Sequence, residues 1–197
     1  MNIPRRALFG RLNAALFRAI ESATTFAKLR GNPYVELVHW VHQIWQASGN
    51  DLHRVVSHYG LDAAQLEKDI TVALAELPNG ASSINAFSHL IELAVERAWV
   101  YASLSMNDRS IRGAWLLAAA LETPELRRAL LGISAVFQKI PVMQWQRTFR
   151  WSLRSPARVK VPCRILSANL LAYPVKPVQR LTMAKEVKVL WKSTRRI

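Results

Sequence analysis

Hydrophobic positions in residues 1–140 recur at spacings of three and four, which is the spacing of one face of an α-helix. Two such stripes stand out, the first made of Leu8, Phe9, Leu12 and Leu16 and the second of Tyr34, Val38, Val41 and Trp45. The apolar-polar alternation of β-strands is nearly absent. The pattern predicts helices over residues 5–15, 16–29, 34–47, 51–58, 62–77, 84–104 and 111–121, with one more beginning at residue 124.

The residues between these stretches are typical helix ends. Gly31 and Pro33 are expected to end the second helix, because Gly tolerates a left-handed backbone and Pro cannot continue the hydrogen-bond ladder. Asp62 and Gln65 have the spacing of a capping box, and Thr123 precedes a Pro at the first helical position. Asp51 and Ser83 are expected to cap the helices that follow them, and residues 107–108 to break the long one.

One of these helices has a similar copy later in the sequence. Residues 19–29 read Ala-Ile-Glu-Ser-Ala-Thr-Thr-Phe-Ala-Lys-Leu, and residues 94–104 read Ala-Val-Glu-Arg-Ala-Trp-Val-Tyr-Ala-Ser-Leu. The same offset of 75 residues relates Leu12 to Phe87 and Trp40 to Trp115. A repeated multi-helix unit buries apolar faces that one copy cannot cover. We therefore predict an all-α domain with a pseudo-twofold duplication of a four-helix unit of roughly 70 residues.

The composition changes near residue 140. Residues 1–140 hold 14 Lys and Arg against 12 Asp and Glu, a net charge of +2, whereas residues 141–197 hold 13 against one, a net charge of +12. All seven Gly lie at or before Gly132, and five of the nine Pro lie at or after Pro141. This contrast predicts two parts: a folded domain over 1–140, and a basic, Pro-containing tail of low order over 141–197.

Four segments of the front part carry a family resemblance. They are Leu8-Phe9-Gly10-Arg11-Leu12-Asn13, the helix over residues 35–44, the run Leu52-His53-Arg54-Val55-Val56 with Gly60-Leu61-Asp62, and Ala94-Val95-Glu96-Arg97-Ala98-Trp99-Val100-Tyr101. Together with the duplication, these segments resemble the N-terminal repeat domain of the Clp family of disaggregase ATPases. The similarity covers about residues 8–138 and is greatest to the ClpV (TssH) branch of bacterial type VI secretion.

That resemblance implies a protein-interaction domain. In the ClpV branch the N-terminal domain takes up an amphipathic helix of a TssB/TssC-type sheath protein, so that the ATPase can disassemble the sheath, and full-length ClpV is a second implied partner. It implies that the partner-helix groove lies at the first stripe, and the candidate groove residues are Leu8, Phe9, Leu12, Leu16 and Phe87. Packing of the same stripe into the core is an equally good interpretation, and the sequence leaves both open.

The ATPase machinery of the family is not expected in this chain. Each AAA+ module needs a Gly-rich phosphate loop, and no Gly follows Gly132, so we expect a truncated ClpV-like chain without ATPase activity. The tail is interpreted as a frame-shifted end that holds nucleic acid nonspecifically at low salt. The alternatives are a nucleic-acid-binding protein that uses Trp145 and Trp151 for stacking, or a stand-alone Clp adaptor.

Other candidate chemistry is weak. His39 and His42 lie one turn apart without a further ligand nearby in sequence, and Glu92 and Glu96 have the spacing of a solvated helix face. Cys163 is the only cysteine, which excludes an internal disulfide. We therefore expect no catalytic residues, metal or cofactor. Neither a signal peptide nor a membrane-spanning run is recognisable, which favours a cytoplasmic location.

Overall fold

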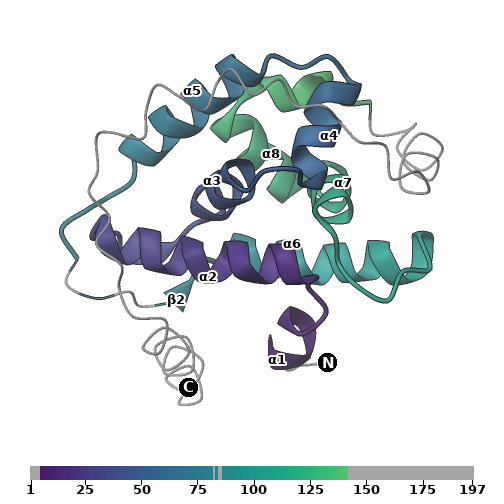
Figure 1. The fold of residues 1–197 in the computed structure, drawn as a ribbon. Coiled ribbons are helices and arrows are strands. Elements are labelled where there is room, and N and C mark those ends of the chain that lie inside the picture. Colours follow the sequence, from purple (N-terminus) through teal and green to yellow (C-terminus); the bar gives the residue numbers. More distant parts are fainter. Residues whose placement is uncertain (1–4, 82, 84–85, 142–197) are drawn as a thin grey trace. The chain divides into compact units, whose positions relative to one another are not determined.

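The computed structural model describes residues 5–81, 83 and 86–141, which form the helical domain in Figure 1. Its helices are α1 (Arg5–Phe9), α2 (Ala14–Leu29), α3 (Leu37–Gln46), α4 (Asp51–His58), α5 (Ala63–Ala75), α6 (His89–Val100), α7 (Gly113–Glu122) and α8 (Pro124–Ile133). A π-helical turn, η1 (Tyr101–Ser105), extends α6, and a 3-10 turn, η2 (Ala135–Lys139), follows α8. The all-α prediction is confirmed. The predicted tail, apart from Pro141, lies outside the described residues, and so does the nucleic-acid alternative that rests on it.

The duplication is visible in the order of the elements. Shifting α2 by 75 residues places it on α6 together with η1, and the same shift places α3 one residue from α7. Short strands also pair between the two repeats. Strand β1 (Tyr34–Val35) pairs in parallel with β2 (Ala86–Phe87), and a second parallel bridge joins Leu12 to Ile111. Each bridge connects the segment after one duplicated helix to the segment before the other, as a pseudo-twofold arrangement requires.

The core lies where the two repeats meet. Helix α3 packs against α2, α4, α5 and α8, while α7 packs against α4, α6 and α8 (Figure 1). Every residue from Ala114 to Leu121 of α7 is buried, so this helix is apolar on all sides. The duplicated tryptophans are buried as well. The Trp40 indole N–H donates to the Leu16 carbonyl at 3.3 Å, and that of Trp115 donates to the Asp108 carboxylate at 2.9 Å.

Several predicted helix ends are confirmed. The Asp62 carboxylate caps α5 by accepting the Gln65 N–H at 2.9 Å, and Pro124 opens α8 after Thr123. Gly31 has φ +70° at the end of α2, and Asn107, which follows the π-helical turn, has φ +51°. Both are left-handed residues of the kind that stops a helix.

Other predicted ends were wrong. The first helix stops at Phe9 instead of residue 15, because residues 11–13 bond to the backbone of Ile111. Helix α6 starts after Ser88 rather than at residue 84, because residues 86–87 form a strand. Two-residue strands carry no alternation that a sequence pattern could reveal.

The cap of α4 is Asn50, not Asp51. The Asn50 side chain accepts the His53 N–H at 3.1 Å, which leaves the Asp51 carboxylate free to reach the other repeat. There it accepts the N–H of Ala114, in the first turn of α7, at 3.3 Å. It also pairs with the Arg112 guanidinium at 3.1 and 3.3 Å. Asp51, a residue of the first repeat, therefore caps a helix of the second repeat.

Candidate docking surface

The five candidate groove residues are mostly interior side chains, and we refer to them together as the stripe. Leu8, Phe9, Leu12 and Leu16 are between 3% and 9% exposed, whereas Phe87 is partly exposed. The rings of Phe9 and Phe87 stack with their centroids 5.5 Å apart, so the structure brings α1 and β2 together. The placement of the stripe agrees with the core interpretation of the free domain. Its role as a groove stays a prediction.

The chain between α1 and α2 is fixed by backbone hydrogen bonds. The Ile111 N–H donates to the Arg11 carbonyl at 2.7 Å, and the Asn13 N–H donates to the Ile111 carbonyl at 2.9 Å. The Arg11 guanidinium lies 4.7 Å from the centre of the Trp99 ring, a cation–π contact with the end of α6. Asn13 then caps α2 by accepting the Leu16 N–H at 2.9 Å. These contacts fix the start of α2 against the second repeat.

The start of the domain is rich in arginine. Residues 5–20 include four Arg and no Asp or Glu. Arg5 forms an ion pair of 2.9 Å with Glu92 of α6, while Arg6, Arg11 and Arg18 are exposed. The start of the domain therefore presents exposed positive charge, which favours a partner with acidic side chains.

Phe17 is a candidate that the sequence analysis missed. Its side chain is 39% exposed on α2, next to the buried Leu16. It falls outside the stripe because Ala14, three residues before it, is exposed, and Asn13 and Glu21, four residues away on either side, are only partly buried. The signal that could have found it is an aromatic residue on the otherwise polar face of an amphipathic helix. Phe17 and the partly exposed Phe87 are two accessible aromatic side chains of this region.

The two histidines of α3 have structural partners. His39 is fully buried, its Nδ1 accepts the Glu36 N–H at 2.9 Å, and its Nε2 lies 3.0 Å from the Asn32 side-chain oxygen. Burial and the nearby Arg30 lower the pKa of His39 to about 4, so the ring is neutral. The ring of His42 stacks on Phe26, with 4.8 Å between centroids, and burial lowers its pKa as well. Both rings contribute to packing.

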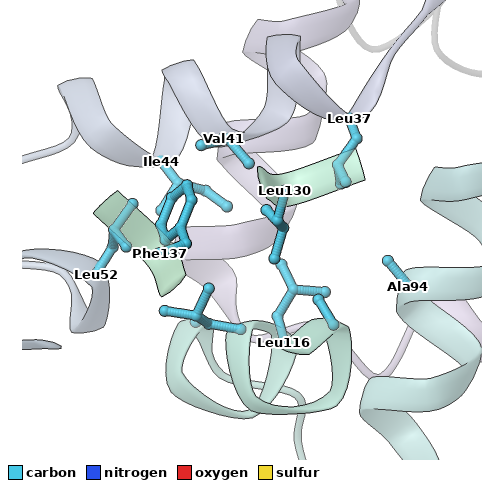
Figure 2. Close-up of a pocket in the computed structure, with 11 residues that line it drawn as sticks. Leu37, Val41, Ile44, Leu52, Ala94, Leu116, Leu130 and Phe137 are labelled. Atoms are coloured by element: carbon cyan, nitrogen blue, oxygen red, sulfur yellow. The ribbon is translucent and has the colours of Figure 1, made fainter. Parts of the chain in front are cut away.

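The part of the chain that the structure describes holds no cluster of metal-binding side chains. No three His, Cys, Asp or Glu side chains gather there as a metal ion would need, and Cys163 lies outside that part. An apolar gap of about 30 Å³ lies among Leu37, Val41 and Ile44 of α3 and their neighbours (Figure 2). Ligand pockets usually exceed ~300 Å³, so this gap is a packing defect of the core.

Not one of the described helices is both long enough and apolar enough to cross a bilayer.

Comparisons with known proteins agree with this architecture. Residues 11–132 match the model of the Clp repeat (R) N-terminal domain. The AAA+ ATPase ClpV1 of Pseudomonas aeruginosa is 54% identical over 140 residues, which cover 71% of this chain and 16% of that protein. The chaperone protein ClpB of Yersinia enterocolitica is 52% identical over 151 residues, which cover 77% of this chain and 17% of that protein. The chain thus spans about a sixth of the length of these curated relatives.

A solved structure gives the same result. It comes from work on the coevolution of the ATPase ClpV, the TssB-TssC sheath and the accessory HsiE protein in type VI secretion. It is 51% identical to this chain with a TM-score of 0.74, and the match covers 76% of this chain and 93% of that one. The expected resemblance to the ClpV branch is confirmed, and the chain belongs to the Clp repeat N-terminal domain family.

Proposed function

We propose that this domain recognises an amphipathic helix of a TssB/TssC-type sheath protein and delivers the sheath to a ClpV-type ATPase for disassembly. The observation that carries the proposal is the 51% identity to a structure studied together with the TssB-TssC sheath. In this proposal the chain contributes recognition, and ATP hydrolysis is the task of the ATPase modules of such a protein.

The docking surface proposed for the helix consists of α1, the start of α2 and β2. The stripe provides apolar anchoring positions. Its partly exposed member Phe87, together with Phe17, provides the aromatic surface that a partner reaches first. A helix that binds in a groove inserts side chains at spacings of three and four residues. The exposed Arg6, Arg11 and Arg18 would meet acidic side chains on the polar edges of that helix.

Binding of synthetic peptides tests this proposal. Fluorescent peptides that tile the TssB and TssC sequences are titrated with the full chain, and bound fractions are measured by fluorescence anisotropy. We expect one amphipathic tile to bind, and Phe17→Ala and Phe87→Ala each to weaken it by about tenfold, or ~1.4 kcal/mol. Val72→Ala is the matched control, because Val72 is 50% exposed on α5 and should leave the affinity unchanged.

Binding by no tile would contradict the proposal, and so would an equal loss of affinity in the Val72→Ala control. Leu12→Asp is a poor test, because Leu12 is only 8% exposed and an aspartate there would be buried without a partner. That variant is expected to unfold the domain. Circular dichroism of every variant separates lost binding from lost structure.

A further inference from the structure

We propose that Asn79 is a site of spontaneous deamidation, and that the isoaspartate formed there loosens the hydrogen bonds that tie its loop to the first repeat. Asn79 and Gly80 lie between α5 and β2, in the segment that joins the two repeats (Figure 1). The inference concerns the chemistry of this loop and is independent of the proposed function.

The first argument is the chemistry of an asparagine that glycine follows. The backbone nitrogen of Gly80 can attack the side-chain carbonyl carbon of Asn79, which forms a cyclic succinimide. The new C–N bond replaces the bond to the side-chain nitrogen, which leaves as ammonia and takes up the proton of the Gly80 amide. Water then opens the ring at either carbonyl, so the products are aspartate and isoaspartate. A glycine favours the first step because it has no side chain that shields its nitrogen.

The second argument is the exposure of this pair of residues. Asn79 and Gly80 both face water. Gly80 has φ +92°, and no described atom lies within 4 Å of the place where a Cβ atom on it would stand. Within residues 5–81, 83 and 86–141, no hydrogen bond holds the Asn79 side chain or the Gly80 N–H. Neither group must therefore give up a described partner before the ring closes.

The third argument is that the loop is tethered on both sides of the pair. The Pro78 carbonyl accepts the Asn32 side-chain N–H at 2.7 Å, and the Ala81 N–H donates to the Gly31 carbonyl at 2.8 Å. An isoaspartate carries the chain through its side-chain carbon and so lengthens the backbone by one atom. Because the extra atom falls between two fixed points, we expect the hydrogen bond to Pro78 to weaken.

The consequence reaches a buried residue. Asn32 is 2% exposed, and its side-chain oxygen lies 3.0 Å from the Nε2 atom of His39 in α3. When the Pro78 carbonyl is displaced, the buried Asn32 amide loses a hydrogen bond, and an unpaired polar group in the interior is costly. The isoaspartate form should therefore be less stable than a chain that gains only a negative charge at this exposed position.

The test ages the full chain in mildly alkaline buffer at body temperature and follows its asparagines by peptide mass spectrometry. Deamidation exchanges an NH2 group for OH, and reversed-phase chromatography separates the aspartate peptide from the isoaspartate peptide. Asn107 is the internal control, because it is exposed like Asn79 but is followed by Asp108. Asn79→Gln keeps the amide and closes a ring far more slowly. Asn79→Asp adds the charge without the extra backbone atom.

We expect Asn79 to gain the mass at least about tenfold faster than Asn107, with isoaspartate as the major product. The urea midpoint of the aged chain should fall with its isoaspartate fraction, while aged Asn79→Gln and fresh Asn79→Asp keep the midpoint of the fresh chain. No gain of mass at Asn79, or an equal rate at Asn107, would overturn the modification site. A midpoint that stays unchanged in the modified chain, or falls equally in either variant, would overturn its effect on the tethers.

Discussion

At the scale of single residues, Asp51 links the two repeats. Its carboxylate accepts the Ala114 N–H and pairs with Arg112, although Asp51 belongs to α4 and its partners lie in and just before the first turn of α7. The side chain of Arg112, the residue that precedes α7, makes no cap hydrogen bond of its own. A carboxylate near the first turn satisfies a free N–H and interacts well with the helix dipole. One buried charge thus adds a polar link between the two repeats.

Asp51→Ala is therefore expected to lower the free energy of unfolding by about 3 kcal/mol, because it leaves the guanidinium and an amide of α7 without their partner. Asp62→Ala removes a carboxylate that caps only its own helix, and it should cost about 1 kcal/mol. Urea denaturation of both variants measures the two losses. Equal losses in the two variants would show that the contacts of Asp51 with the second repeat stabilise the domain no more than an ordinary helix cap does.

His39 gives the domain a dependence on pH. Its pKa is lowered from 6.5 to about 4 in the folded state, so below pH 6.5 the unfolded chain binds the proton first. The contribution of His39 to the free energy of unfolding is fully present above pH 6.5. It decreases by roughly 3 kcal/mol as the pH falls toward 4. Burial lowers the pKa values of His42 and His53 too, which act in the same direction.

Urea midpoints measured between pH 7 and pH 4.5 check this expectation. The midpoint of the unmodified chain should fall steadily with pH, and His39→Gln should flatten the fall because glutamine carries no proton-binding ring. If the urea midpoint of His39→Gln fell as steeply with pH, groups other than His39 would cause the pH dependence of stability.

At the scale of elements, the sequence was most reliable where one residue type decides the local backbone. Pro124 at the start of α8, the Asp62 cap of α5 and the left-handed Gly31 were all predicted. The errors occurred where contacts between the repeats decide. Strands β1 and β2 exist because the segments beside the duplicated helices meet, and Asp51 leaves its own helix for α7. Neither effect is visible in one stretch of sequence.

The candidate site, like the fold, was predicted only in part from the sequence. Leu8, Phe9, Leu12 and Leu16 were recognised from their spacing, and Phe87 was added from the family resemblance. The spacing could not tell a groove from a core, because both need the same apolar face. Phe17 was missed because it stands off that face. Its exposure depends on how α2 packs, which the pattern of one helix does not determine.

The gap in the core offers a test of packing at the scale of elements. Val41 of α3 lines the gap shown in Figure 2. Val41→Ile adds one methylene group, which should fill part of the space and raise the free energy of unfolding by about 0.8 kcal/mol. Val72→Ile makes the same change at a half-exposed position of α5 and should have little effect. Thermal unfolding followed by circular dichroism compares them, and a less stable Val41→Ile would mean that the core is already full.

At the scale of the whole molecule, the described core extends past α8. Phe137 and Ile140 are 1% and 4% exposed, and they complete the interior after α8. The domain boundary near residue 140, expected from the change in charge and Gly content, stays a prediction.

A fragment of residues 1–140 is accordingly expected to be monomeric and helical and to unfold in one cooperative transition. A fragment of residues 1–134 lacks Phe137 and Ile140, and it should unfold at a much lower temperature because the core around α7 and α8 is left open. Circular dichroism melting curves compare the two. A broad transition in the longer fragment would show that later residues complete the fold.

The central claim is that the domain binds a sheath helix at α1, the start of α2 and β2. Backbone amide chemical shifts, followed by NMR while the tightest TssB or TssC tile is added to the full chain, test it most directly. The account predicts that the largest shifts occur in residues 5–18 and 86–92, with little change in α5. Shifts that gather on α5 or in residues 142–197, with residues 5–18 unmoved, would contradict it.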